Sequence, residues 1–373
     1  MTSKWSQPHL LREATLLCHS TYQKYKWTSH KHPFWLFYWQ WKTHAPELIN
    51  KLIQGRYQPQ PMIAYYFDGE TEPYWPHFDR VIQRILYVLI KPTFKYIIEK
   101  TCLHLGGPSA IKKAAHQIEK ALKQTPYSYI IRTDIKSYYA SINHSVLKDQ
   151  IRAEFDDPRV IHELCTIIDV PIDCGGYLRT PQTGIPRKSS FSSFFAALYL
   201  KPLDRWCARH PHIFYCRFYD DIILFCRSKR QCAKAKRALK NILHQLKLRL
   251  APTKTKIGLI DKGFHFLGMN LEVAQTPQKV HTTQNLEDTL TTQKERPVQP
   301  AYQDVRVSLH PQSYHRSIDQ WKIRREGVGN PTEAQIYLKR WARWWAHAHH
   351  QIQYSDLLDQ WRWVLKRVPI DTQ

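Results

Sequence analysis

The 373-residue sequence has no run of 18 consecutive apolar residues and no N-terminal apolar stretch followed by a small-residue cleavage site. We therefore expect neither a membrane-spanning helix nor secretion. The eight cysteines include no Cys-x-x-Cys pair and no Cys/His cluster at zinc-ligand spacing. Such cysteines are typical of reduced thiols in a cytoplasmic protein, and the length excludes a disulfide mini-protein.

Acidic residues are few relative to basic ones. The chain has 31 Asp and Glu against 55 Lys and Arg, which gives a net charge of +24. Because like charges repel one another, this excess destabilises the folded state. It also attracts a polyanion such as nucleic acid. A hydrophobic fraction of 43% with 13% aromatic residues indicates a folded globular chain, long enough for two or three subdomains.

The hydrophobic pattern changes along the chain. Residues 34–42, FWLFYWQWK, favour a buried helix over a base-stacking platform. Residues 78–103 have helical spacing that Pro92 interrupts, and Ser109 stands where it would cap the next helical stretch. The later segments YIIRTDIKSYYASI, PHIFYCRFYDDIILFC and GFHFLGMNLEV have strand character and alternate with helical stretches. This order predicts an α+β core, a sheet with helices packed on one face.

Residues 272–300 are polar and rich in Thr, Gln and Pro, so we predict a weakly ordered connector. Residues 301–373 are basic, have a helical pattern and carry six of the 13 tryptophans, which predicts a separate helical module. The predicted divisions are residues 1–125, 126–271, 272–300 and 301–373.

Carboxylates stand beside apolar strands at two places, Asp134 and the pair Asp220-Asp221. Taken singly, each is explained by a solvent-exposed turn. Together with TGIPRKSSFSS, LAPTKTKIG and FHFLGMNL, which occur in that order with RTDIKSYYASINH and RFYDDIILF, they resemble the palm of a bacterial reverse transcriptase of the group II intron-like kind. The resemblance covers roughly residues 50–271 and extends more weakly into the C-terminal module.

This resemblance implies a right-hand polymerase with an N-terminal extension and fingers in residues 1–125, a palm in 126–271 and a helical thumb in 301–373. It implies RNA-directed DNA synthesis in the cytoplasm, with an RNA template, a DNA or RNA primer and deoxynucleoside triphosphates. A cognate structured non-coding RNA or an accessory protein is a further candidate partner. No stretch resembles a ribonuclease H domain or a zinc-bearing endonuclease module.

The resemblance also implies metal ligands. Phosphoryl transfer needs two divalent cations that clamp the attacking and leaving oxygens, Mg²⁺ by expectation with Mn²⁺ as a substitute. Hard cations select carboxylate oxygens, so Asp134 and Asp220 are the expected bridging ligands. Asp221 and the carbonyl of Ile135 are further candidates.

Other residues are assigned to the nucleotide in the same way. Tyr139 stands where the family places a bulky side chain against the sugar, with a core tyrosine as the alternative. Lys254 matches the lysine that approaches the leaving pyrophosphate, with a solvated surface lysine as the alternative. In TGIPRKSS, Gly184, Arg187 and Lys188 are expected at the nucleotide. Lys188 stands where the family has glycine, so it either contacts a phosphate or narrows the pocket.

The family's usual basic pair is absent from residues 63–75, which contain no Lys or Arg. Arg56, Arg80 and Arg187 are candidate substitutes. This departure leaves the residues that bind the triphosphate open.

Primer and template contacts are expected from Phe266 and Gly268 in FHFLGMNL, which resembles the primer-gripping hairpin, and from Arg340 and Arg343 in LKRWARWW. An ordinary edge hairpin is the alternative for the first pair. For the whole chain, the alternatives are a diversity-generating or phage-defence reverse transcriptase with specialised or relaxed templating, and a catalytically silent nucleic-acid binder. The intact acids argue against the silent binder.

Overall fold

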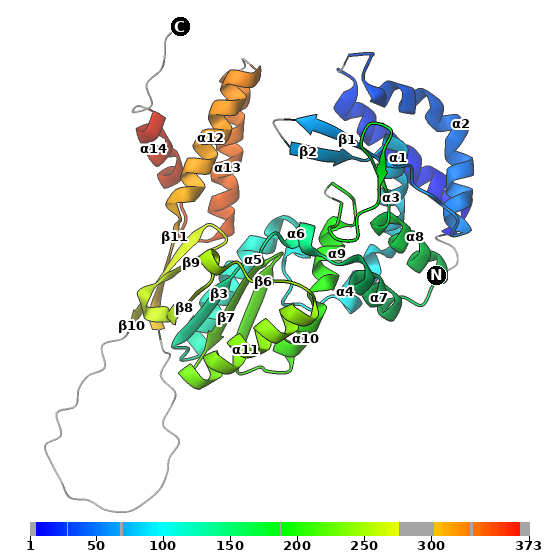
Figure 1. Ribbon diagram of the computed structural model, residues 1–373. Coiled ribbons are helices and arrows are strands. Elements are labelled where there is room, and N and C mark those ends of the chain that lie inside the picture. Colours follow the sequence, from blue (N-terminus) through cyan, green and yellow to red (C-terminus); the bar gives the residue numbers. More distant parts are fainter. Residues whose placement is uncertain are drawn as a thin grey trace, which may run out of the picture. The chain divides into compact units, whose positions relative to one another are not determined.

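The computed structural model describes residues 5–27, 29–67, 70–186, 188–275, 302–328 and 331–365 (Figure 1). The chain forms two compact units, each assembled from separate stretches. The first unit comprises Met1–Leu105, Ile135–Arg209 and Ala238–Ala251, and the second comprises Gly106–Asp134, His210–Arg237 and Pro252–Gln373. Both units combine helices with a sheet, so the predicted α+β class is confirmed.

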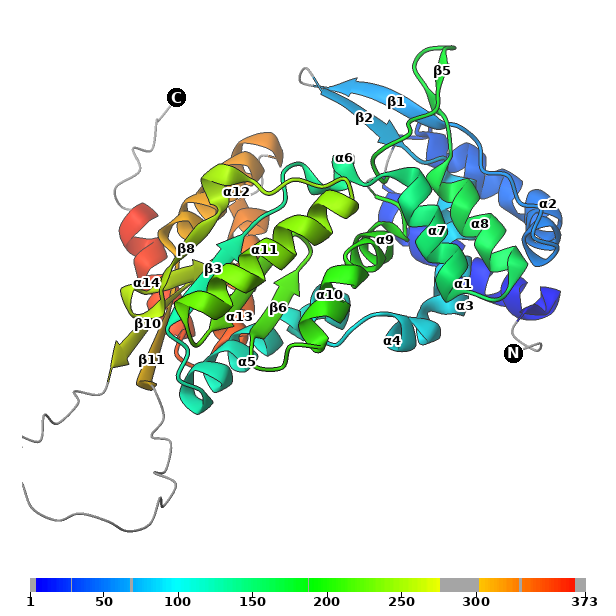
Figure 2. The ribbon, with the colours of Figure 1, turned by 60° about the horizontal axis from the view of Figure 1, so that its bottom comes forward.

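The first unit contains a four-stranded sheet and most of the short helices. Its helices are α1 (Gln7–Tyr25), α2 (Pro33–Ile53), α3 (His77–Ile90), α4 (Phe94–Ile97), α6 (Tyr138–Ser141), α7 (His144–Glu154), α8 (Pro158–Ile168), α9 (Ser192–Tyr199) and α10 (Lys201–Ala208). Its strands, in sheet order, are β2 (Glu70–Tyr74), β1 (Met62–Phe67), β4 (Ile172–Asp173) and β5 (Leu178–Arg179). Figure 2 shows α7 and α8 side by side.

The aromatic stretch at residues 34–42 lies in α2, which packs against α1 and α3. Phe34, Phe37 and Trp41 are buried, and the rings of Phe34 and Phe37 lie 5.7 and 5.5 Å from the ring of His77 on α3. Trp39 is 63% exposed, because it lies on the opposite side of the helix. The stretch is chiefly core, as predicted.

Two predicted helix boundaries have different outcomes. α3 ends at Ile90, before Pro92, as predicted. The next long helix, α5 (Ala110–Gln124), begins where predicted, but the Ser109 side chain makes no capping hydrogen bond. The backbone of Ser109 has φ −86° and ψ 5°, and it lacks the extended conformation that a capping side chain needs. The predicted cap was therefore wrong.

The second unit is built on an antiparallel sheet in the order β6 (Phe214–Phe218), β7 (Asp221–Cys226), β3 (Tyr129–Thr133) and β8 (Lys256–Leu259). Ile131 on β3 lies opposite Leu224 on β7 and Ile257 on β8. Residues 222–226 of β7 are all fully buried, which explains why this strand reads as a continuous apolar run. At its end, Cys226 hydrogen-bonds Cys232 at the start of α11 (Lys229–Gln245).

A second sheet in this unit has the order β11 (Tyr302–Leu309), β10 (Met269–Gln275) and β9 (Phe264–Phe266). Residues 272–275, predicted as the start of the connector, extend β10, and the rest of the connector lies outside the described residues. Residues 302–309, predicted as helical, form β11. Val305, Val307 and Leu309 alternate as buried residues, and this period of two selects a strand paired with β10.

Three helices complete the second unit, α12 (Pro311–Val328), α13 (Pro331–Ala348) and α14 (Tyr354–Leu365). Trp361 and Leu338 are buried together, and Trp341 packs against them. Helical structure after residue 310 was therefore predicted correctly.

Among the helices that the structure describes, none combines the length and apolar character that a membrane crossing requires. All eight cysteines are free, and Cys174 is exposed whereas six of the others are buried.

Gly268 joins the β9–β10 turn to the helices of the second unit. Its φ is +81°, and a Cβ placed there would lie 2.8 Å from both Ser313 Oγ and Trp345. Its carbonyl accepts hydrogen bonds from the backbone N–H of His310 at 2.8 Å and from Ser313 Oγ at 3.1 Å. Only glycine satisfies both the conformation and the close approach.

Gly268→Ala should therefore lower the free energy of unfolding by about 2 kcal/mol or more, because it adds backbone strain and overpacking. Chemical denaturation measures the change. Gly258→Ala on β8 is the matched control, since a Cβ there meets nothing within 4 Å. An equal effect of the two substitutions would contradict the packing described for Gly268.

Candidate active site

The three acids predicted as metal ligands lie at one end of the four-stranded sheet of the second unit. Asp134 directly follows β3, and Asp220 and Asp221 lie at the turn between β6 and β7. In the β3–β7 register, Thr133 lies opposite Ile222, so the residues next to each acid are paired. Antiparallel pairing thus brings together carboxylates that are far apart in the sequence.

The turn that carries Asp220 is tight. Phe218 pairs with Asp221, which leaves Tyr219 and Asp220 as a two-residue turn. Tyr219 has φ +55°, a conformation that is uncommon for an aromatic residue. The fully buried Arg217 donates from Nη1 to the carbonyl of Tyr219 at 3.2 Å. This buried guanidinium supports the strained residue and fixes Asp220 at the tip of the hairpin.

The acids disfavour one another's ionisation. Burial raises the pKa of Asp221 to about 6, and the negative charges of Asp220 and Asp134 add to this effect. Burial also raises the pKa of Asp220, with the charge of Asp134 adding to it and that of Lys254 opposing it. The three carboxylates therefore lie close enough to repel each other, and a bound cation would relieve the repulsion.

Lys254 offsets part of this charge. Its Nζ lies 2.6 Å from Asp134 Oδ2, and this bond raises the pKa of the lysine. The side chain remains 62% exposed. It lies in the 3₁₀ turn Pro252–Lys254, and the adjacent Thr255 Oγ1 hydrogen-bonds Thr133 Oγ1 at 2.7 Å. The two threonines attach this turn to the end of β3, so Lys254 reaches the acid cluster.

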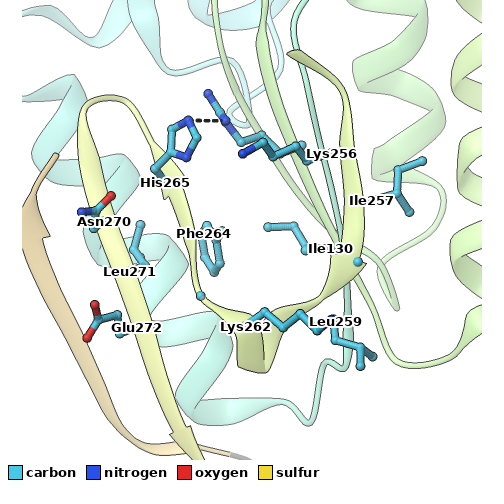
Figure 3. Close-up of a pocket in the computed structure, with 13 residues that line it drawn as sticks. Ile130, Lys256, Ile257, Leu259, Lys262, Phe264, His265, Asn270, Leu271 and Glu272 are labelled. Carbon is cyan, nitrogen blue, oxygen red and sulfur yellow. Dashed lines mark hydrogen bonds between the residues drawn. The ribbon is translucent and has the colours of Figure 1, made fainter. Parts of the chain in front are cut away.

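Arg132 belongs to this site although the sequence did not single it out. It lies two residues before Asp134, on the same face of β3, and its Nη1 hydrogen-bonds His265 Nε2 on β9 at 2.5 Å (Figure 3). Burial, and then the charge of Arg132, lowers the pKa of His265 to about 4, so this ring is neutral and accepts the bond at pH 7. Burial lowers the pKa of Arg132, and the negative charges of Asp221 and Asp134 oppose this effect.

Arg132 also lines a pocket of about 370 Å³ between β8 and the β9–β10 hairpin. Figure 3 shows Lys256 and His265 at one end of this pocket and Lys262 and Glu272 at the other. The Nε of Arg132 is buried and has no hydrogen-bond partner. The period of two that links Asp134 to Arg132 could have found this residue, but its bond to His265 depends on the tertiary fold.

The donor set of the acid cluster fits a hard divalent cation. Asp134, Asp220 and Asp221 offer carboxylate oxygens. Burial and then neighbouring negative charge raise the pKa of Asp220 and Asp221, and a bound cation would balance that charge. Ile135, whose carbonyl was a further candidate, is buried in the first unit, and its backbone forms a bridge with Leu250.

A second group of potential metal ligands does not fit an ion. The ligand atoms of Glu119, His349 and His350 lie within 4.8 Å of one another. However, His349 Nδ1 accepts from the backbone N–H of Gln351, and its Nε2 lies 3.2 Å from Glu119 Oε2. Both ring nitrogens are thus engaged, which fixes the tautomer that carries the proton on Nε2. Glu119 also accepts from Lys123 at 2.7 Å, so the group ties α5 to the end of α13 by hydrogen bonds.

Three of the predicted nucleotide-binding residues line one pocket of the first unit. Tyr139, Gly184 and Lys188 contribute to a cavity of about 340 Å³. The loop around Gly184 is fixed by backbone hydrogen bonds from Gly184 to Ile142 at 2.7 Å and from Ile185 to Tyr139 at 2.9 Å. Gly184 has φ +92°, and a Cβ there would lie 3.4 Å from a backbone oxygen, so glycine is needed. Arg187 lies outside the described residues.

Lys188 has φ +65°, the left-handed conformation that favours glycine. This agrees with its predicted alignment to a glycine of the family. Its side chain is 62% exposed, and its Nζ forms an ion pair with Glu72 on β2 at 2.5 Å. Arg80 is a candidate substitute for the basic pair that residues 63–75 lack. It donates a hydrogen bond to the hydroxyl of Tyr74 at 2.9 Å.

The predicted primer and template residues lie in the second unit. Phe266 is fully buried, so its backbone alone could reach a primer. Arg340 and Arg343 are exposed on α13. Trp345 is buried, whereas Trp344 is 41% exposed, so the tryptophans of this helix are not all core.

Comparison with known proteins identifies the class. The family model described as "Reverse transcriptase (RNA-dependent DNA polymerase)" matches residues 73–271, more than half of the chain. The chain therefore belongs to the reverse transcriptase family, which confirms the resemblance seen in the sequence. Among curated proteins it is similar to Protein YkfC of Escherichia coli (strain K12), at 24% identity over 266 residues, covering 60% of this chain and 70% of that protein.

The raised pKa of Asp221 has a consequence for stability. Its charged form is disfavoured in the folded state, so the stability of the native protein should fall as the pH rises from about 4 to above 6. Asp221→Asn should therefore raise the free energy of unfolding at pH 8, without divalent cations, by about 1–3 kcal/mol, and the gain should shrink toward pH 4.5. Urea unfolding across this pH range in EDTA measures it. Asp149→Asn changes an exposed acid and should show no such pH-dependent gain in the free energy of unfolding. If Asp221→Asn were less stable than the wild type at pH 8, the repulsion described here would be contradicted.

Proposed function

We propose that the protein is an RNA-directed DNA polymerase that extends a primer with deoxynucleotides on an RNA template by two-metal phosphoryl transfer. The observation that carries the proposal is the convergence of Asp134, Asp220 and Asp221 at one end of the sheet, within the residues matched to the family. Two Mg²⁺ ions held there, or Mn²⁺ in their place, would activate the attacking hydroxyl and stabilise the leaving oxygen.

The residues of this chain have distinct proposed roles. The three acids bind the cations, with the carbonyl of Ile135 as a further ligand. Lys254 pairs with Asp134, and its side chain is exposed. In the reaction its ammonium group would turn toward the leaving pyrophosphate and offset the negative charge there. Tyr139 closes the pocket that it shares with Gly184 and Lys188 against a 2′-hydroxyl.

For the architecture we propose fingers with an N-terminal extension in residues 1–125, a palm in 126–271 and a thumb that starts at 301. The exposed Arg340 and Arg343 of α13 would contact phosphates of the template-primer duplex, and the turn at Gly268 would contact the primer. The net charge of +24 supports a nucleic-acid partner. With eight free cysteines, we place the activity in the cytoplasm.

A second candidate is a reverse transcriptase of a diversity-generating or phage-defence system, with specialised or relaxed templating and a cognate structured RNA or accessory protein. Two observations favour it: the β1–β2 hairpin contains no Lys or Arg, and the ammonium of Lys188 is paired with Glu72. Sequencing the nucleic acid that copurifies with the protein from cells separates the two. One dominant structured RNA supports the second candidate, and a broad mixture of RNAs contradicts it.

Asp220→Asn keeps the shape of the side chain and removes its charge, so it should lower primer extension about 100-fold or more while folding is retained. Extension of oligo(dT) on poly(rA) with dTTP and Mg²⁺ measures the rate. Asp134→Asn should behave alike, whereas Asp149→Asn should match the wild type. Near wild-type extension by Asp220→Asn would refute the metal assignment, and a wild type that extends no primer would leave the silent nucleic-acid binder.

Tyr139→Val should reduce the preference for deoxynucleotides over ribonucleotides by about tenfold or more, because the ring that would clash with the 2′-hydroxyl is lost. The ratio of kcat/KM for dTTP and UTP measures this preference. Tyr139→Phe is the matched control, since it keeps the ring and should keep the preference. Unchanged discrimination in Tyr139→Val would mean that this residue only packs in the core.

A further inference from the structure

A second pocket of the first unit is lined, among the residues that the structure describes, by cations and hydroxyl groups and by no acid. Its volume is about 320 Å³, and it lies where α1, α3 and residues 188–190 meet. Arg80 and Arg84 of α3 and Lys188 supply positive charge, and Ser20 of α1 and Ser190 supply hydroxyls. A lining of this kind suits an anion that accepts several hydrogen bonds.

Gln83 gives independent evidence for a ligand. It lines this pocket and is 1% exposed. Its Oε1 accepts a hydrogen bond from Ser189 Oγ at 2.8 Å, but its Nε2 has no hydrogen-bond partner. Buried amide N–H groups are normally paired, so an unpaired donor among three cations indicates a site for an anionic oxygen.

The charges around this pocket favour an anion. Burial, and then the charge of Arg80, lowers the pKa of His77 to about 4, so this lining residue is neutral at pH 7. Arg80 is half-buried and is held by its bond to Tyr74. Glu72 pairs with Lys188 and would compete with an incoming anion for that ammonium.

The positive surface continues beyond the pocket. Arg84 also lines a neighbouring shallow pocket with Tyr87, Lys91 and Lys95. Arg84 lies over the ring of Tyr87 at 5.2 Å. Lys95 lies over the ring of Tyr96, which is 79% exposed, at 4.7 Å. A row of cations with aromatic rings between them fits a single nucleic-acid strand better than an isolated anion.

We propose that the pocket between α1 and α3 binds one phosphate of a single-stranded nucleic acid, and that the strand continues past Arg84 toward Lys95. The identification of this strand as template rests on the proposed polymerase function. The α1 wall lies before residue 73, outside the residues matched to the family.

Fluorescence anisotropy with a labelled single-stranded RNA of about 20 nucleotides tests the site, in the full chain without nucleotides or Mg²⁺. Arg84→Gln should weaken binding about tenfold and reduce the slope of log affinity against log salt by about 0.7. Gln83→Glu keeps the size of the side chain but replaces the unpaired donor with a carboxylate, and should weaken binding at least as much. Lys42→Gln, which removes an exposed cation of α2, should stay within about twofold of the wild type.

Two further variants test the site, one without a buried charge and one with a gain of binding. Gln83→Met avoids a buried charge but loses the hydrogen bond from Ser189 Oγ, so circular dichroism checks its folding, and it should weaken binding about threefold. Glu72→Gln frees Lys188 and should tighten binding about twofold or more. Wild-type affinity and salt slope in Arg84→Gln and Gln83→Met would overturn the site.

The remaining outcomes distinguish a phosphate of a nucleic-acid strand from that of a nucleoside triphosphate. They also distinguish failure of the strand site from failure of the proposed polymerase function. If the Arg84 and Gln83 variants bind RNA normally but raise the KM for deoxynucleotides, the pocket takes a triphosphate, and the strand assignment is wrong. The binding assay needs no catalysis, so its result does not depend on the polymerase activity. If the wild type extends no primer while Arg84→Gln still weakens RNA binding, the strand site stands and the polymerase proposal fails.

Discussion

The repulsion among three carboxylates at the end of one strand pair is the constraint on which the site depends. Asp134 follows β3, Asp220 lies in the adjoining turn, and Asp221 begins β7. Burial and neighbouring negative charge raise the pKa of Asp220 and Asp221. The fold holds them there with a buried Arg217 behind the turn and with Lys254 against Asp134. Such a cluster costs free energy in the absence of cations, which is typical of sites shaped by function.

The acids could be predicted because they stand in short motifs whose order along the chain resembles a known family. Each follows or precedes an apolar strand, and antiparallel pairing of those strands brings their ends together. Lys254, which a short motif singled out, lies beside Asp134, and Lys188, which stands at a glycine position of the family, has a positive φ. In these places the information lies in short motifs and in their order along the chain.

Other features depend on contacts between distant segments and were missed. The Arg132–His265 bond needs β9 beside β3, and the Lys188–Glu72 ion pair needs β2 beside the loop at residue 188. Residues 302–309 look basic and helical when read with the segment that follows, but pairing with β10 makes them a strand. Gln83 gives no sequence signal at all, since its importance lies in an unpaired buried donor.

The most direct test of the account is the effect of Mg²⁺ on thermal stability at pH 8. A cation that binds the acid cluster of the native state should raise the melting temperature of the wild type in proportion to the logarithm of its concentration above the Kd. This rise is expected in the wild type and should be lost in Asp134→Asn and Asp220→Asn. A wild type whose melting temperature does not respond to Mg²⁺ or Mn²⁺, or variants that respond equally, would contradict it.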